Sequence, residues 1–121
     1  MSSAALADWT SGAHALVYQR CEACKSTWYF RRTFCPHCGG SAVTDVEASG
    51  RGVVHAVTLV TRAPTEEMRA YAPYLIVLID VDEGFRLMAH GEASLEIGDR
   101  VRIGFKTLAG RLIPYFEKEH A

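Results

Sequence analysis

The chain has 121 residues, of which 49% are apolar and 22% are charged, and its formal net charge is −1. This length has room for one ordinary domain, or for a small module joined to a compact barrel, and the composition is that of a globular chain rather than of a disordered one. The balance of 13 basic and 14 acidic residues argues against a dedicated nucleic-acid-binding protein, because such proteins gather Lys and Arg to neutralise phosphates.

The N-terminal region predicts a short helix and a cytoplasmic location. Residues 1–8 have neither the basic start nor the apolar segment of a secretion signal, and the longest apolar run, Tyr74 to Ile79, is much shorter than the about 20 residues that cross a bilayer. Between Ala4 and Tyr18, apolar residues recur near the helical period, although Ser11 and Gly12 interrupt the run. We therefore expect a helical segment here, in a protein of the reducing cytoplasm.

All four cysteines belong to two CxxC pairs, Cys21 with Cys24 and Cys35 with Cys38, separated by ten residues. The two-residue spacer of each pair turns the backbone so that both sulfurs face one point, and two such knuckles complete a closed tetrahedral site of four sulfurs. Zinc is the expected metal, with iron in the same thiolates as the alternative. Disulfides are disfavoured in a reducing compartment, and a thioredoxin-like redox centre would need a βαβ context that the sequence lacks.

The expected zinc is structural. A segment of about 27 residues is too small to fold on a hydrophobic core alone, whereas zinc binding to such peptides contributes about 10 to 16 kcal/mol. Four thiolates leave no open coordination position, so the metal cannot activate water. His37 lies between Cys35 and Cys38 and is expected to point to solvent, because four sulfurs already fill the coordination shell.

Between the knuckles, Ser26 to Phe34 forms an aromatic and basic segment that is expected to be extended. Aromatic faces stack on bases and guanidinium groups bind phosphates, so this segment could hold the adenine and phosphate end of a nucleotide-containing ligand such as coenzyme A. The candidate residues for that role are Trp28, Phe30, Arg31 and Arg32. The alternative is that Trp28 and Phe30 share one strand face and pack the ribbon onto the barrel or onto a partner, while the arginines are solvated.

From Val46 onward, short β-type runs alternate with glycine-containing turns. We expect strands over Val53–Arg62, Tyr74–Val81, Phe85–His90, Arg100–Lys106 and Leu112–Phe116. In the long connection before the second strand, Thr65 could cap one helical turn. Five short strands without a long helix favour a small OB-type barrel, with an SH3-like barrel as the alternative. The predicted chain is mainly β, with an N-terminal helical segment (1–18), a rubredoxin-like zinc ribbon (19–45) and a C-terminal OB-fold barrel (46–121).

We expect no catalytic residue in this chain. The sequence contains no GxSxG elbow, glycine-rich phosphate loop or HExxH helix. His55 and His90 lie in expected strands and are interpreted as structural, because acid–base catalysis needs positioned partners that the sequence does not reveal. The acidic residues Asp80, Asp82 and Glu83 are interpreted as ordinary turn carboxylates.

The order of these features resembles that of one known family. Trp9 in the N-terminal segment, Leu16 to Arg20 before the first knuckle, CPHCGG at the end of the ribbon, and the stretches SGRG, PYLIVLIDVDEG and IGDRVRIGF resemble the OB-fold, zinc-ribbon, acyl-CoA-associated protein family. The resemblance covers nearly the whole chain. One departure is Lys25, which follows Cys24 where many relatives have glycine, so some strain is expected in the first knuckle.

The resemblance implies an accessory role. Members of that family typically assemble with thiolase-like enzymes, with hydroxymethylglutaryl-CoA synthase-like enzymes, or with hydratases and aldolases of steroid side-chain breakdown. It implies that the four cysteines hold zinc, that the nucleophile lies in the larger partner, and that this chain stabilises the partner and helps shape the path of the CoA substrate. The expected function is a non-catalytic accessory subunit, in a hetero-oligomer with a thiolase-type acyltransferase.

Three alternatives to this function remain open. The chain could be the accessory subunit of an acyl-CoA hydratase or aldolase complex. It could be a single-stranded nucleic-acid-binding protein, since zinc ribbons and OB folds both serve that purpose elsewhere. It could also be a self-sufficient enzyme that uses His55 or His90.

Overall fold

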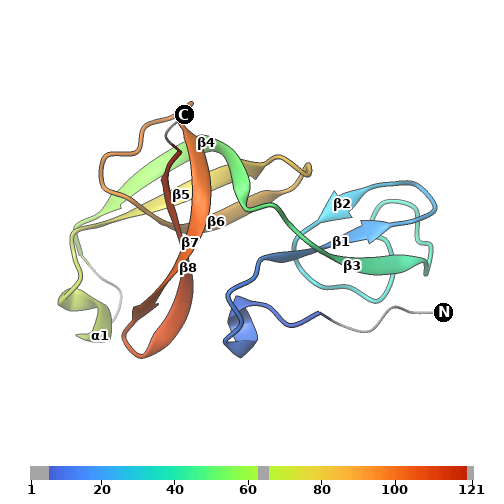
Figure 1. Ribbon diagram of the computed structural model, residues 1–121, viewed down its shortest axis with the longest axis horizontal. Coiled ribbons are helices and arrows are strands. Elements are labelled where there is room, and N and C mark those ends of the chain that lie inside the picture. The colour runs from blue at the N-terminus through green and yellow to red at the C-terminus, as the bar shows by residue number, and fades with distance from the viewer. Residues whose placement is uncertain (1–5, 63–65, 120–121) are drawn as a thin grey trace.

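The computed structural model describes residues 6–62 and 66–119 and shows two β modules side by side (Figure 1). The N-terminal module is a three-stranded antiparallel sheet in the order β2-β1-β3. Its strands are β1 (Val17–Cys21), β2 (Thr27–Trp28) and β3 (Val43–Glu47). The second module is a closed barrel in the order β4-β5-β6-β8-β7. Its strands are β4 (Arg51–Val60), β5 (Tyr74–Val81), β6 (Arg86–Gly91), β7 (Arg100–Leu108) and β8 (Arg111–Lys118). The expected mainly β architecture is confirmed.

The helical part of the N-terminal region is one 3-10 turn, η1 (Trp9–Ser11). The Asp8 carboxylate caps it by accepting a 3.0 Å hydrogen bond from the Thr10 N–H. Gly12 ends it in a left-handed conformation, with φ of 93°, so the turn stops where the sequence interrupts the helical period. The chain then straightens, and Val17 already belongs to β1. Residues 1–5 of the expected helical segment lie outside the described part of the chain.

Strict alternation along the strands builds the barrel core. In β5 and β6 every second side chain is buried, as expected for strands that have one face toward a core and the other toward solvent. The inward residues of these two strands are Leu75, Val77, Ile79, Val81, Leu87, Ala89 and Gly91. Val101 from β7 and Phe116 from β8 complete this core and are fully buried.

Two glycines at the start of β4 allow three strands to meet closely. Gly50 has φ of 78°, and a Cβ atom there would lie 2.2 Å from the Cγ2 atom of Ile103. A Cβ atom on Gly52 would lie 2.5 Å from the Asp80 carbonyl oxygen, because Gly52 pairs with both β5 and β7. The SGRG stretch therefore has a steric cause, which is the tight entry of the chain into the barrel.

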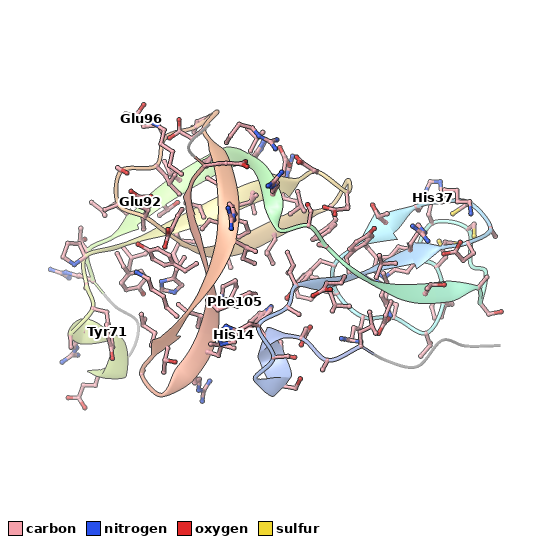
Figure 2. All side chains as sticks on the ribbon, in the orientation of Figure 1. His14, His37, Tyr71, Glu92, Glu96 and Phe105 are labelled. Atoms are coloured by element: carbon pink, nitrogen blue, oxygen red, sulfur yellow. The ribbon has the colours of Figure 1, made fainter. Side chains whose placement is uncertain are left out.

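Aromatic stacking joins the ribbon to the barrel. Phe85, just before β6, stacks on Tyr18 of β1 with ring centroids 4.9 Å apart, and it lies parallel to Tyr29 at 6.1 Å. A second ring contact, 5.3 Å between His14 and Phe105, ties the N-terminal segment to β7 (Figure 2). Tyr18 and Phe85 belong to one hydrophobic cluster together with the barrel residues, so the two modules share a core.

A group of hydrogen bonds to Glu83 lies beside this shared core. The Glu83 carboxylate, in the turn between β5 and β6, accepts hydrogen bonds from the Ser49 N–H at 2.7 Å and from the Ser49 hydroxyl at 3.1 Å. The Thr27 hydroxyl of the ribbon donates to the Glu83 carbonyl at 3.4 Å. The turn carboxylate thus fixes the linker between the modules, a role that turn chemistry alone did not predict.

The long connection before β5 contains one helical turn, α1 (Glu66–Arg69). Its expected cap, Thr65, lies outside the described residues. Tyr71, which follows this turn, accepts a 3.2 Å hydrogen bond on its hydroxyl from the Ala109 N–H, so the connection is tied to the β7–β8 hairpin (Figure 2). No helix in the described ranges is long and apolar enough to span a membrane.

We predict that Phe85→Ala destabilises both modules together, by about 3 to 5 kcal/mol, because it removes a buried ring that two ribbon tyrosines contact. The measurement is urea denaturation of the zinc-loaded protein, followed by circular dichroism. Met88→Ala is the matched control, since Met88 lies in the adjoining strand but is 69% exposed. Equal unfolding midpoints for the two variants would contradict the shared core.

Candidate functional site

Two knuckles with the same backbone geometry carry the cysteines. In the first knuckle the Lys25 N–H donates to the Cys21 carbonyl at 2.8 Å, and in the second the Gly39 N–H donates to the Cys35 carbonyl at 2.9 Å. Lys25 and Gly39 both adopt left-handed φ angles, 65° and 76°. Lysine thus takes at the first knuckle a conformation that suits glycine, which is the local strain expected from its departure from the family pattern.

The four sulfurs gather at one point. The Sγ atoms of Cys21 and Cys38 are 3.6 Å apart, as are those of Cys24 and Cys35, and all four lie within 4.8 Å of one another. A tetrahedral zinc ion with Zn–S bonds of about 2.3 Å separates its sulfurs by about 3.8 Å. The spacing is too long for a disulfide and close to that of a zinc tetrahedron, so the donor set fits zinc.

Backbone N–H groups point at these sulfurs and favour their thiolate form. Cys35 accepts from the N–H groups of His37 and Cys38, at 3.3 and 3.4 Å, and Cys38 accepts from Gly40 at 3.4 Å. His37 therefore contributes its backbone, while its side chain is exposed (Figure 2) and its imidazole is not among the gathered ligand atoms.

The four thiols cannot all ionise without a bound cation. Hydrogen bonds from the Ser26 hydroxyl and N–H lower the pKa of the Cys24 thiol to about 6. At Cys38 the Gly40 N–H favours the thiolate, but the three neighbouring sulfurs outweigh it and raise the pKa of Cys38 to about 12. Four thiolates in so small a volume need a cation, and zinc binding must release the remaining protons. Zinc held by four sulfurs stabilises the fold and leaves no position for a reacting molecule.

The segment between the knuckles, residues 25–34, is called the arm below. Its regular part is short, because β2 ends at Trp28 and the chain then bends. Gln19 of β1, only 6% exposed, supports the arm from underneath: its Oε1 atom accepts from the Trp28 indole N–H at 2.8 Å and from the Arg32 backbone N–H at 2.6 Å. The arm is therefore anchored in its middle as well as at the two knuckles.

Arg31 ties the arm to the N-terminal segment. Its guanidinium lies 2.5 Å from the Asp45 carboxylate, donates to the Leu6 carbonyl at 2.7 Å, and lies 3.5 Å from Asp8. Burial of the Asp45 carboxylate opposes its ionisation, but hydrogen bonds from Gln19, from the Leu6 N–H and from Arg31 hold the pKa of Asp45 below its usual range. The Arg31 charge is thus already used within the chain.

The remaining arm side chains point in two directions. Tyr29, a member of the aromatic segment that was not among the candidate CoA-binding residues, packs toward the barrel and accepts a 2.9 Å hydrogen bond from the Trp9 indole N–H. Phe30 and Phe34 are 78% and 53% exposed. The Arg32 guanidinium makes no hydrogen bond or ion pair with any part of the chain that the structure describes. Tyr29, rather than Trp28 or Phe30, therefore makes the aromatic contact with the barrel.

A groove of about 380 Å³ runs between the arm and the barrel. The arm contributes Trp28, Phe30 and Arg32 to its walls, and the barrel contributes Phe85 and Arg86. Three of the four candidate CoA-binding residues, all but Arg31, therefore line one groove. An aromatic wall beside a guanidinium is chemistry suited to a base and its phosphate.

The two strand histidines have partners that the sequence did not reveal. The His55 Nδ1 atom lies 3.2 Å from the Asp80 carboxylate, which also accepts a 2.7 Å hydrogen bond from Arg86. His90 stacks on Tyr74 at 4.9 Å, and burial lowers the pKa of its imidazole. The His55 and Asp80 side chains are each nearly half exposed on the outer barrel surface.

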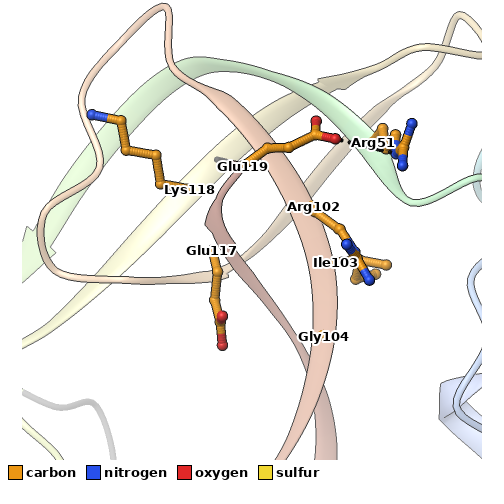
Figure 3. A pocket seen from close by; sticks show the side chains of 7 residues that line it. All are labelled: Arg51, Arg102, Ile103, Gly104, Glu117, Lys118 and Glu119. Carbon is orange, nitrogen blue, oxygen red and sulfur yellow. Dashed lines mark ion pairs between the residues drawn. The ribbon is translucent and has the colours of Figure 1, made fainter. Parts of the chain in front are cut away.

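Another hollow, of about 520 Å³, lies beside strands β4, β7 and β8 (Figure 3). Its walls mix basic and acidic side chains, and the Arg51 guanidinium lies 3.4 Å from the Glu119 carboxylate. The opposite charges compensate one another, so this hollow has no strong preference for an anion or a cation.

We predict that the wild-type protein contains one zinc ion per chain and that Cys21→Ser loses it, because one of the four thiolates is removed. Metal content is measured by mass spectrometry, and folding of the ribbon by near-ultraviolet circular dichroism. His37→Ala is the matched control and keeps full zinc. Wild-type protein without stoichiometric metal, or loss of zinc in His37→Ala, would contradict the four-sulfur site.

Comparison with family models assigns each of the two modules to a known domain family. Residues 9–44 match the model described as the ChsH2 rubredoxin-like zinc ribbon domain, and residues 45–106 match the model described as the ChsH2 C-terminal OB-fold domain. The metal is therefore a structural zinc, and the closed barrel is an OB fold.

Similar proteins carry related names. A DUF35 domain-containing scaffold protein of Methanothermobacter thermautotrophicus is 28% identical over 96 residues, which cover 75% of this chain and 71% of that protein. A similarly named protein of Methanocaldococcus jannaschii is 31% identical over 61% of this chain and 52% of its own length. A probable enoyl-CoA hydratase alpha subunit of Thermomonospora curvata is 36% identical over 62% of this chain, which corresponds to only 23% of that protein.

Solved structures agree with this assignment. A chain described as Ltp2-ChsH2(DUF35) aldolase superposes with a TM-score of 0.73 at 30% identity, covering 86% of this chain and 84% of that one. A DUF35 protein of unknown function from Sulfolobus solfataricus has the same fold, with a TM-score of 0.59 at 16% identity over 87% of this chain and 76% of that one. With family models that match both its ribbon and its barrel, this chain belongs to the ChsH2 (DUF35) family of zinc-ribbon, OB-fold proteins.

Proposed function

We propose that this protein is a non-catalytic accessory subunit of an enzyme complex that acts on acyl-coenzyme A, with a thiolase-type acyltransferase as its catalytic partner. The observation that carries the proposal is the anchored arm with its exposed Phe30 and Phe34 rings. Exposed aromatic side chains on a fixed backbone are typical of the centres of protein interfaces. The names of the relatives support the scaffold role and the link to acyl-CoA.

Zinc has a defined place in this function. Cys24 precedes the arm and Cys35 follows it, so one metal ion holds both ends of the arm in place. Gln19 then holds the middle of the loop, and Arg31 clamps it to Asp45. An arm that is ordered in advance loses little conformational entropy when it meets a partner or a ligand.

The arm also supports a contribution to CoA binding. Within the described residues the Arg32 guanidinium has no partner and can bind a phosphate, and Phe30 offers a ring face on which an adenine can stack. Trp28 provides a half-buried wall of the same groove. Arg31 acts indirectly, because its salt bridges position the arm on which Arg32 lies.

The identity of the partner has a supported alternative. The relative named as a hydratase subunit and the similar chain from a structure named as an aldolase support a hydratase or an aldolase as the alternative to a thiolase. A cytoplasmic complex is expected in each case. The proposed division of labour is the same for each partner, with the larger subunit supplying the reacting groups.

We predict that this chain co-elutes in size exclusion with the acyl-CoA enzyme encoded beside it and is required for the full solubility or activity of that enzyme. Comparing thiolytic, hydration and retro-aldol activity of the purified complex distinguishes the three partner classes. A neighbouring enzyme that is fully soluble and active alone, and never co-elutes, would contradict the accessory role. Salt-dependent micromolar binding of single-stranded oligonucleotides by the isolated chain would favour the nucleic-acid alternative instead.

Arg32→Ala is predicted to raise the KM of the complex for its acyl-CoA substrate about tenfold while zinc content and complex assembly stay unchanged, because a charge-assisted phosphate contact is lost. Arg69→Ala, in the exposed turn α1, is the matched arginine control and leaves the KM unchanged. Equal KM values for the two variants would show that Arg32 does not bind the CoA phosphates, without affecting the accessory role.

A further inference from the structure

An apolar row of side chains lies on the outer face of strands β4, β5 and β6. Leu78 of β5 has Ala56 of β4 on one side and Met88 of β6 on the other, as the cross-strand register shows. Ile76 and Thr58 form the next pair along the same face. These residues, four apolar side chains and one threonine, are called the apolar stripe: Ala56, Thr58, Ile76, Leu78 and Met88.

The stripe is not part of the barrel core. Alternation along β5 and β6 turns Val77, Ile79 and Leu87 inward, so Ile76, Leu78 and Met88 must point outward. Met88 is 69% exposed. A contiguous apolar patch with polar residues at its rim is a feature of surfaces that bind another molecule.

The ionisable groups at the two ends of the stripe are either paired with an opposite charge or uncharged. At one end the Asp80 carboxylate is paired with Arg86 at 2.7 Å and with His55 at 3.2 Å. At the other end His90 stacks on Tyr74, and burial lowers the pKa of His90, so its ring is neutral at pH 7. A surface without net charge is complementary to a neutral, apolar protein surface, and it offers nothing to the phosphates of a nucleic acid.

The stripe is continuous with the groove beside the arm. Arg86 pairs with Asp80 at the end of the stripe and also lines the groove that contains Phe30 and Arg32. One large partner can therefore cover stripe and arm together. A second copy of this chain is less suitable, because a stable interface needs more than about 1,200 Å² of buried surface, and among the large apolar side chains of the stripe only Met88 is exposed while Ile76 and Leu78 are half-buried.

We propose that the apolar stripe docks an apolar surface segment of the catalytic partner subunit, with Met88 at the centre of the contact. Strands β5 and β6 are the second and third strands of the barrel, and this face of OB folds commonly receives ligands. Here its side chains suit a protein rather than an oligonucleotide. The inference rests on the proposed accessory function and adds the surface through which the barrel takes part in it.

The test compares Met88→Glu with Ile97→Glu and Met88→Leu in binding to the purified acyl-CoA enzyme that co-elutes with the wild-type chain. Ile97 is the matched control, because it is 67% exposed elsewhere on the barrel. Met88→Glu is expected to raise the Kd at least tenfold with unchanged zinc content and melting temperature, while the other two variants bind like wild type. Partner binding should also shift the methyl resonance of Met88 in carbon-13-labelled protein.

Each contrary result has a separate meaning. Wild-type affinity in Met88→Glu overturns the docking surface and leaves the accessory role standing, whereas a wild-type chain that binds no acyl-CoA enzyme removes the accessory role itself. Light scattering that finds a wild-type dimer converted to a monomer by Met88→Glu assigns the stripe to a second copy and overturns the proposal. Weakened oligonucleotide binding in the same variant overturns it as well.

Discussion

Four sulfurs around one zinc ion impose the constraint on which the rest of the molecule depends. Cys24 and Cys35 stand at the two ends of the arm, so a metal that holds both fixes where the arm begins and ends. A peptide of this size has no core that could do so. The buried amide of Gln19 then sets the height of the arm above the sheet. Exposure of Phe30 is therefore a consequence of metal coordination rather than of a loose loop.

The barrel supplies what the ribbon lacks, which is apolar volume. Phe85 fills the gap between Tyr18 and Tyr29, and Glu83 fixes the linker at Ser49. These contacts set the direction of the ribbon relative to the barrel strands (Figure 1). The arm and the apolar stripe consequently lie on one continuous surface, and neither would have a defined position relative to the other without this junction.

Features that depend on short-range geometry could be predicted from the sequence. The CxxC spacing fixes each sulfur pair within one turn of chain, and the nearly continuous apolar run from Tyr74 to Val81 predicts β5. The engagement of Arg31 could not be predicted, because Asp8 and Asp45 reach it from distant segments. The barrel contact of Tyr29 was also missed: β2 ends at Trp28, so the alternation that would have placed Trp28 and Phe30 on one face stops there.

The stacked rings of Tyr18, Tyr29 and Phe85 have a consequence for the life of the protein in a cell. The zinc ion folds the ribbon, and the folded ribbon covers the Phe85 ring of the barrel. Chains that fail to acquire the ion expose that ring and become substrates for proteases and chaperones. Mass action then couples the amount of folded subunit to metal availability, so zinc starvation would limit assembly of the proposed complex.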